Sequence, residues 1–232
     1  MRRIAAVLAT VCLLPAVAHV GEPASSRPEL SLGRSAQYDY DPPKPGTYRL
    51  PVIQPAGDGN VLTAEGKKAR LKDIVQGQVT ILSFIYTRCA DPRACPMATG
   101  ALYQIHEISQ QDTEIAENLR LVTFSFDPEH DTPTVMGEYG GFVRPGGKGS
   151  EWMFLTTRST RELQPILTAY GQRVDPKRNA LDPLGPFYHV VRVYLIDRQG
   201  MIRNIYSYGM LDPRMVLADV RTLVMESSVA GR

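Results

Sequence analysis

The feature that most constrains the fold is an uninterrupted apolar and β-branched run, VTILSFIY, over residues 79–86. Such a run is typical of a central strand that is buried on both faces of a sheet. Beyond a short loop, Pro96 stands where a first helical turn tolerates proline, and apolar residues at helical spacing follow over 97–108. A second buried strand is expected over 119–126. The order of these three elements predicts a right-handed βαβ unit.

In the rest of the folded region, helices and strands first continue to alternate, and a hairpin and a final helix then follow. Further elements are expected as a helix from 132–133, a strand at 152–155, a helix at 163–170, a hairpin from 190–196 and 202–206, and a helix at 211–225. Strands that first alternate with helices and then form a hairpin fit one architecture. The sequence predicts an α/β, thioredoxin-like fold in which helices flank a mixed central β-sheet.

The N-terminus has the pattern of a bacterial secretory signal. A basic start, an apolar run over 4–17 and the small-residue motif at 16–18 predict cleavage after Ala18 and a periplasmic location. Because the run is short for a membrane span, a tether to the inner membrane by an uncleaved N-terminus is the alternative. We therefore expect a signal peptide over 1–18, a Pro-rich linker or arm over 19–49, and the thioredoxin-like domain over 50–228.

Charge limits the classes of partner. Loss of Arg2 and Arg3 with the signal would reduce the 26 basic residues to 24, equal to the 24 acidic ones. A neutral mature protein argues against nucleic acid or an anionic membrane surface as a partner. A chain of this length can bury one core without oligomerisation, so we expect a monomer. After cleavage of the signal we also expect no stable membrane span.

Processing would leave Cys89 and Cys95 as the only cysteines, because Cys12 lies within the signal. Cys89 follows the central strand and Cys95 begins the next helix, at the sheet edge where open α/β folds place their sites. A helix N-terminus favours a thiolate, and Arg88 and Arg93 would add to this effect if they face the sulfurs. A thiolate serves disulfide exchange or ligates a soft metal, so the pair alone is compatible with both, and also with a structural disulfide.

Several motifs together resemble one family. They are FIYTRC at 84–89, Cys95-Pro96, SFDPEHDTP at 125–133, Trp152 with 154–156, and His189 ahead of YLID at 194–197 and Gly200. Their order and spacing, spread over about 50–225, resemble the Sco/SenC family, thioredoxin-like copper proteins of cytochrome c oxidase assembly.

The resemblance implies a Cu(I) or Cu(II) site in which Cys89 and Cys95 supply thiolates and His189 supplies an imidazole. Thiolates select Cu(I), and imidazole suits either oxidation state. Asp127 is expected either to orient His189 or a loop amide, or to cap the helix from 132. Of the remaining candidates, His130 is expected on a surface loop, His106 on a solvated helix face, and Met97 in the core.

The chain departs from the family pattern in the cysteine loop. Five residues, ADPRA at 90–94, separate Cys89 from Cys95, where the family usually has three. The two additional residues either bulge outward and leave the sulfurs close together, or shift one thiol away from His189.

Two functions follow from these residues. The first is an exported metallochaperone that delivers copper to, or maintains the thiols of, a cuproenzyme such as cytochrome c oxidase. The second is a thiol–disulfide oxidoreductase that acts on a partner thiol or disulfide protein through Cys89 and Cys95. His189 discriminates between them, because copper binding needs it and disulfide exchange does not. A peroxidase is disfavoured, since Thr87-Arg88-Cys89 lacks the Thr-x-x-Cys spacing of peroxiredoxins.

The proposed cleavage site predicts the mass of the exported protein. The mature chain should begin at His19, because the small residues at 16–18 fit the cleavage site of a signal peptidase. Intact-mass spectrometry of exported material checks this. A mass that retains residues 1–18 would contradict cleavage and favour the tethered form.

Overall fold

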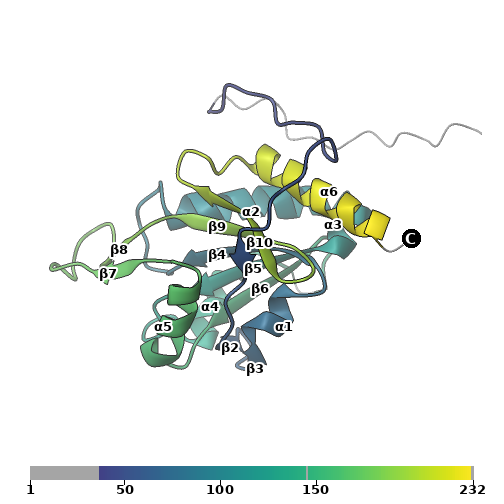
Figure 1. Cartoon of the computed structure of the whole chain (residues 1–232). Coiled ribbons are helices and arrows are strands. Elements are labelled where there is room, and N and C mark those ends of the chain that lie inside the picture. Colours follow the sequence, from purple (N-terminus) through teal and green to yellow (C-terminus); the bar gives the residue numbers. More distant parts are fainter. Residues whose placement is uncertain (1–36, 145, 231–232) are drawn as a thin grey trace, which may run out of the picture.

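The structure is a computed structural model that describes residues 37–144 and 146–230 (Figure 1). Its strands are β1 (Gln54–Pro55), β2 (Asn60–Thr63), β3 (Lys68–Arg70), β4 (Val79–Ile85), β5 (Leu119–Ser125), β6 (Glu151–Thr156), β7 (Val174–Pro176), β8 (Phe187–His189), β9 (Arg192–Ile196) and β10 (Met201–Ser207). Its helices are α1 (Leu71–Val75), α2 (Cys95–Ser109), α3 (Thr113–Asn118), α4 (Pro133–Tyr139), α5 (Thr160–Ala169) and α6 (Pro213–Ala230).

Strand β4 lies inside the main sheet, whose strand order is β1-β10-β9-β4-β5-β6-β2-β3. All seven of its residues are buried, as the apolar run predicted. It pairs in parallel with β5, from Val79↔Leu119 to Ile85↔Ser125, and antiparallel with β9. The sheet is therefore mixed, and the predicted thioredoxin-like α/β architecture is confirmed.

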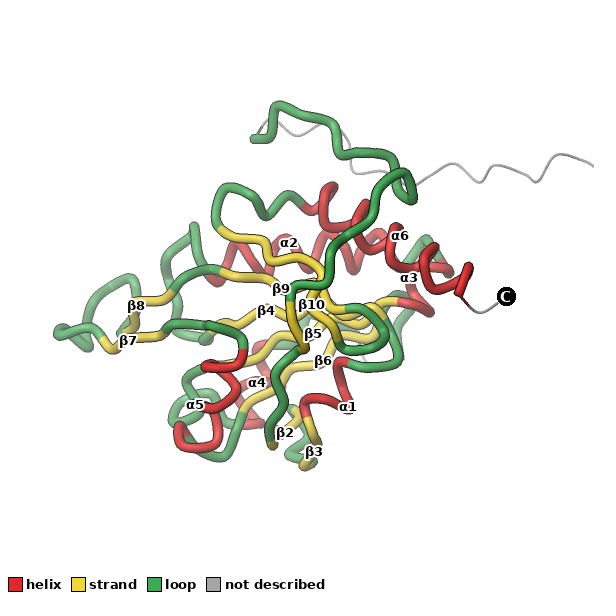
Figure 2. The backbone as a smooth tube through the Cα atoms, viewed as in Figure 1, coloured by secondary structure: helices red, strands yellow, loops and turns green. Residues whose placement is uncertain are grey.

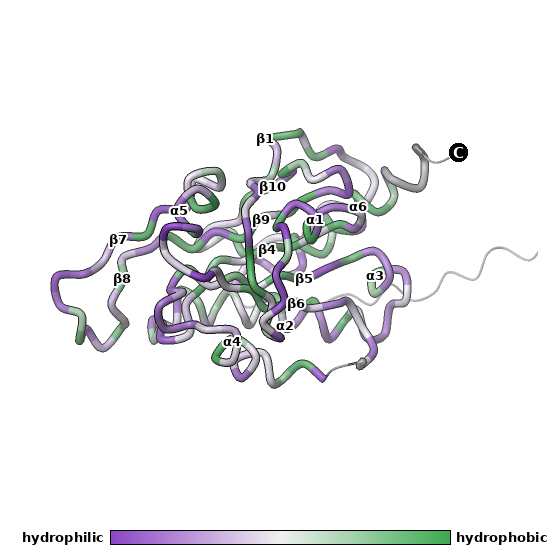
Figure 3. Tube along the Cα trace, turned by 90° about the horizontal axis from the view of Figure 1, so that it is seen from below, coloured by the Kyte–Doolittle hydropathy of each residue, from purple (hydrophilic) through white to green (hydrophobic). Residues whose placement is uncertain are grey.

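Helices cover both faces of this sheet (Figures 1 and 2). Helices α2 and α6 contact one another and β4 on one face, while α1, α4 and α5 lie on the opposite side in Figure 2. Figure 3 shows hydrophobic stretches along the middle strands and also in the helices around them. The core thus lies between the buried central strands and the helices that cross them.

The inner face of α2 contains one residue that the sequence analysis misplaced. His106, expected in solvent, is only 7% exposed, and its ring lies 5.6 Å from that of Trp152 on β6. The aromatic partner across the helix–sheet interface allows a polar ring to replace an apolar one there. Met97 packs partly buried against the core, as expected.

A second, two-stranded sheet carries the candidate histidine. Strands β7 and β8 pair antiparallel, with Val174 opposite His189, and form a ribbon that projects from the body of the molecule in Figure 1. The sequence analysis placed His189 before a strand, whereas it is the last residue of β8. Strands of three residues contain too little pattern to be recognised in a sequence.

The described part of the expected linker packs on the domain. It has no helix or strand over 37–50 and runs along α6 (Figure 1). The Tyr48 hydroxyl donates to Asp219 at 2.6 Å, the Gly46 amide donates to Thr222 at 3.1 Å, and the Tyr38 hydroxyl donates to the Leu211 carbonyl at 2.9 Å. These contacts extend the packed region beyond the boundary expected at residue 50.

The predicted signal peptide and its cleavage site lie outside the described residues. No helix in the described part of the chain combines the length and the apolar character that a membrane span requires.

Deletion of the arm tests the domain boundary. Removing residues 19–49 from the mature chain should lower the free energy of unfolding by about 1–3 kcal/mol, because hydrogen bonds to Asp219 and Thr222 are lost at about 1 kcal/mol each. Urea denaturation measures the difference, and Tyr48→Phe in the full mature chain isolates one of these bonds. Equal unfolding free energies would place the domain boundary at residue 50.

Candidate metal centre

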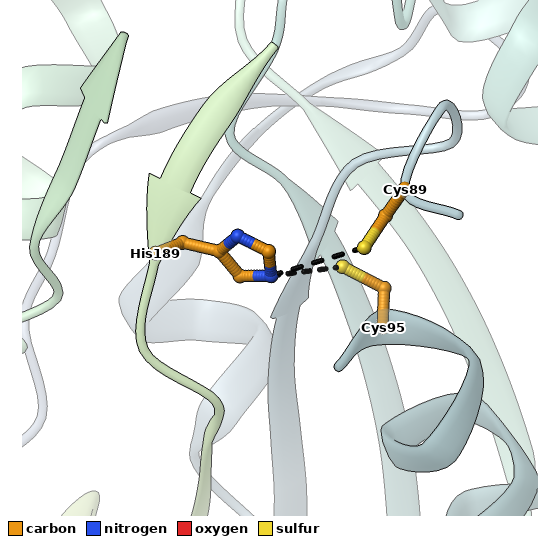
Figure 4. Close-up of side chains that lie close together, drawn as sticks. All are labelled: Cys89, Cys95 and His189. Atoms are coloured by element: carbon orange, nitrogen blue, oxygen red, sulfur yellow. Dashed lines mark hydrogen bonds between the residues drawn. The ribbon is translucent and has the colours of Figure 1, made fainter. Parts of the chain in front are cut away.

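Three separate elements bring Cys89, Cys95 and His189 together (Figure 4). Cys89 lies in the loop after β4, Cys95 is the first residue of α2, and His189 ends β8. The His189 Nε2 atom lies 3.5 Å from the Cys95 sulfur and 3.9 Å from the Cys89 sulfur. All three potential ligand atoms lie within 4.8 Å of one another. Both cysteines are buried, and neither forms a disulfide.

This spacing fits one small metal ion. Metal–sulfur and metal–nitrogen bonds of about 2.3 and 2.0 Å, set at 120°, place sulfur and nitrogen about 3.7 Å apart. The two observed sulfur–nitrogen distances, 3.5 and 3.9 Å, bracket this value. Two thiolates and one imidazole form a soft donor set, which suits Cu(I) and zinc and excludes magnesium and calcium as preferred ions.

The widened loop bulges outward. Its backbone folds into a turn around Asp91, which accepts hydrogen bonds from the Arg93 amide at its carboxylate and from the Ala94 amide at its carbonyl, each at 3.0 Å. Pro92 and Arg93 are exposed, whereas Ala94 returns to the core. Of the two outcomes expected for the additional residues, the structure therefore shows the one that keeps the sulfurs together.

A buried carboxylate that the sequence analysis missed fixes the start of this loop. Asp131 is fully buried and accepts hydrogen bonds from the Thr87 amide at 3.0 Å, from the Thr87 hydroxyl and from the Ser125 hydroxyl. It thereby joins the ends of β4 and β5 two residues before Cys89. The signal for it was present, since Asp131 belongs to the SFDPEHDTP segment.

Asp127 contacts the same loop through Arg88. Its carboxylate is buried and pairs with Arg88 at 2.7 Å, next to Cys89 in the chain. The cap of α4, one of the two roles expected for Asp127, belongs instead to the Thr132 hydroxyl, which accepts from the Val135 amide. Orientation of His189 or of a loop amide by Asp127 stays a prediction. His130 lies exposed in the adjoining turn, as expected.

The two thiols differ in protonation. A hydrogen bond from the Cys95 thiol lowers the pKa of Cys89 to about 4. His189 and backbone amides contribute less in the same direction, and burial of Cys89 acts in the opposite direction. The same bond, together with burial, raises the pKa of Cys95. In the reduced, metal-free protein these interactions favour the thiolate at Cys89 and the protonated thiol at Cys95.

These directions bear on two expectations from the sequence. The helix N-terminus at Cys95 was expected to favour a thiolate there, whereas burial and the interaction with Cys89 raise the pKa of Cys95. Arg88 and Arg93 were expected to act on the sulfurs if they faced them, and they pair instead with Asp127 and Asp91.

Aromatic rings enclose the histidine. The His189 ring centroid lies 5.4 Å from Tyr86, edge-on at 88°, and 5.3 Å from Phe126. Burial and then the negative charge of the cysteine pair, chiefly at Cys89, raise the pKa of Tyr86, so it remains a neutral hydroxyl. Neither ring was identified as part of the site from the sequence, because each continues an apolar strand pattern.

Fold and site together define a thioredoxin-like protein with a Cys₂His centre at the carboxyl end of its central parallel strands. A family model described as SCO1/SenC matches residues 57–225, and the chain belongs to the SCO1/SenC family. The resemblance drawn from the sequence motifs is therefore confirmed. Comparison with curated protein sequences finds no match.

Solved structures agree with the fold. Copper-bound ScoI from Arabidopsis thaliana is 21% identical, with a TM-score of 0.61 over 74% of this chain and 98% of that chain. Copper-bound ScoI from Bradyrhizobium japonicum is 23% identical, with a TM-score of 0.53 over 72% and 98%. BsSco, a member of the Sco family of cytochrome c oxidase assembly proteins with a disulfide switch, is 20% identical, with a TM-score of 0.59 over 77% and 98%.

Alkylation of the reduced, metal-free protein tests the protonation assignment. Because the pKa of Cys89 is about 4, its thiolate population is nearly constant above about pH 5, and its rate of reaction with iodoacetamide should change little from about pH 5 to about pH 8. An ordinary thiol would react about tenfold more slowly for each pH unit below about 8.5. Peptide mapping by mass spectrometry assigns the modified cysteine.

Cys95→Ala is the matched control for this profile. It removes the hydrogen bond that contributes most to the lowered pKa of Cys89, so the rate profile of Cys89 should shift to higher pH. Preferential modification of Cys95 in the parent protein would contradict the assignment.

Proposed function

We propose that this chain is an exported copper metallochaperone that holds one copper ion between Cys89, Cys95 and His189. The observation that carries the proposal is the convergence of two sulfurs and one imidazole nitrogen within 4.8 Å. Membership of the SCO1/SenC family supports it, as do the copper-bound structures of two fold relatives. The proposed recipient is a cuproenzyme such as cytochrome c oxidase, since BsSco is described as an assembly protein of that enzyme.

The donor set supplies both tight binding and a route for release. Cys89 already offers a thiolate, whereas Cys95 must lose its proton, so copper binding releases a proton and weakens at low pH. Three ligands leave copper open to a further ligand from a recipient protein, and stepwise exchange of ligands can then pass the ion on.

A thiol–disulfide oxidoreductase is the second candidate, and the unequal protonation of the two cysteines favours it. The Cys89 thiolate would attack a partner disulfide, forming a mixed disulfide and releasing one partner thiolate. Cys95, on losing its proton, would then attack the Cys89 sulfur and release the second partner thiolate. The partner disulfide is reduced by two electrons as Cys89 and Cys95 become a disulfide.

The two functions connect through the same sulfurs. A disulfide between Cys89 and Cys95 has no thiolate to offer to copper, so oxidation of the pair would release the ion. The exported location follows from the N-terminal motif, with an uncleaved inner-membrane tether as the alternative, and a monomer is the proposed oligomeric state.

Copper titration of three variants separates the candidates. The reduced mature protein should bind one copper ion and the oxidised protein none. His189→Ala should weaken Cu(I) binding by about 100-fold or more, because it removes a direct ligand, while leaving exchange with a small disulfide nearly unchanged. Cys89→Ala or Cys95→Ala should abolish both tight copper binding and the intramolecular disulfide. Competition with a chromophoric Cu(I) chelator gives the affinities.

His130→Ala is the matched control, since it removes an exposed histidine from a neighbouring turn. It should leave copper affinity unchanged. Copper binding that survives His189→Ala would contradict the proposed site, and strong exchange activity with that result would favour the oxidoreductase. Parallel titration with zinc establishes which soft ion the site prefers.

A further inference from the structure

The loop ahead of β8 lies directly on the cysteine loop at one glycine. A β-carbon built on Gly185 would lie 2.0 Å from the Tyr86 hydroxyl oxygen and 3.0 Å from the Arg88 carbonyl oxygen. Both distances are far shorter than a van der Waals contact. Gly185 also has φ of 101°, a conformation that other residues adopt only under strain. The backbone at this position can approach the cysteine loop only because the residue is glycine.

The chain around Gly185 is an ordered turn. Asp182 accepts hydrogen bonds from the Leu184 amide at its carboxylate and from the Gly185 amide at its carbonyl, each at 2.8 Å. Asp182 also pairs with the Lys177 ammonium at 3.1 Å, and the Lys177 amide donates to the Pro186 carbonyl at 2.7 Å. These bonds attach the turn to the β7–β8 ribbon, so a displacement of Gly185 would also move the ribbon.

Tyr86 connects this turn with the histidine. Its hydroxyl donates to the Leu184 carbonyl at 3.3 Å. Its ring meets those of Phe187 and His189 edge-on, with centroids 5.2 and 5.4 Å apart. One side chain at the end of β4 therefore contacts both the turn and the imidazole that the ribbon carries.

The ribbon depends on such contacts for its position. Two strands of three residues form only a marginal structure by themselves, and the side chains of Leu181 and Tyr188 are 89% and 64% exposed. Its described anchors to the body include Tyr86, the Phe126 ring and the hydrogen bond from Gln172 to the Val190 carbonyl at 2.7 Å. Of these, the Tyr86–Gly185 contact lies directly beside the cysteine loop.

We propose that the contact between Tyr86 and Gly185 positions His189 against the two cysteine sulfurs. Tyr86 and Gly185 are positioning residues in this account, because they touch the ligand-bearing ribbon and are not themselves copper ligands. The proposal rests on the proposed function insofar as His189 is a copper ligand. It also implies that a change in the ribbon lowers copper affinity without changing the rate of thiol–disulfide exchange.

Gly185→Ala tests the contact, with Gly66→Ala as its matched control. Both glycines have positive φ, but a β-carbon at Gly66 would meet nothing within 4 Å, so the control reports backbone strain alone. Gly185→Ala should weaken Cu(I) binding by about 10- to 100-fold, as loss of a group that orients a ligand does. Gly66→Ala should leave the affinity unchanged. Tyr86→Phe, which keeps the ring and removes the hydroxyl, should weaken binding about threefold.

A double-mutant cycle shows whether the effect passes through the histidine. In the His189→Ala background, Gly185→Ala should cause no further loss of copper affinity. An equal loss in both backgrounds would overturn the proposal, because Gly185 would then act on the sulfurs or on folding. Exchange of each variant with a small disulfide should stay within about twofold of the parent, because each variant keeps both thiols.

An NMR measurement on the metal-free protein tests the positioning role of Gly185 independently of copper binding. In NMR spectra of the reduced, metal-free protein, nuclear Overhauser contacts between the His189 and Tyr86 rings should be present in the parent and in Gly66→Ala, and lost in Gly185→Ala. Retention of these contacts in a folded Gly185→Ala protein would overturn the positioning role. Failure of the parent protein to bind copper would refute the proposed function and leave this test intact.

Discussion

The buried carboxylate of Asp131 is the interaction on which the site depends. It accepts hydrogen bonds from Thr87 beyond β4 and from Ser125 at the end of β5, and so holds the ends of two parallel strands in fixed relation. Cys89 lies two residues after Thr87, and the Asp127–Arg88 pair holds the residue between them. A buried carboxylate is costly unless it is hydrogen-bonded, and these donors satisfy it.

The arrangement of the cysteine loop gives Cys89 and Cys95 different pKa values. The interaction between the two sulfurs lowers the pKa of Cys89 in the loop and raises that of Cys95 on the helix, so it favours one negative charge on the loop cysteine. Separate charges on both sulfurs would repel at such short range, and a bound cation removes that repulsion. A metal ion at the proposed site would therefore meet a thiolate at Cys89 and displace a proton from Cys95.

The long apolar elements could be predicted from the sequence, because burial on both faces leaves an unmistakable pattern at 79–86 and 119–126. The position of the cysteines followed from those elements. The short strands β1, β2 and β3 and the ribbon strands β7 and β8 could not be predicted, since two to four residues contain no periodicity.

Other features depend on tertiary contacts that no local pattern encodes. His106 is buried because Trp152 lies across from it, and Asp131 matters because two strand ends meet at its carboxylate. The lowered pKa of Cys89 depends first on its interaction with Cys95 and then on His189 and backbone amides, which only the folded chain brings together. The outward bulge at 90–94 likewise depends on the turn that Asp91 forms.

X-ray absorption spectroscopy of the copper-loaded, reduced protein tests the central claim most directly. The account predicts that each copper ion has two sulfur neighbours and one imidazole nitrogen, and that His189→Ala removes the nitrogen while both sulfurs remain. A copper ion with no sulfur neighbour, or an unchanged nitrogen contribution in His189→Ala, would contradict a metal centre built from Cys89, Cys95 and His189.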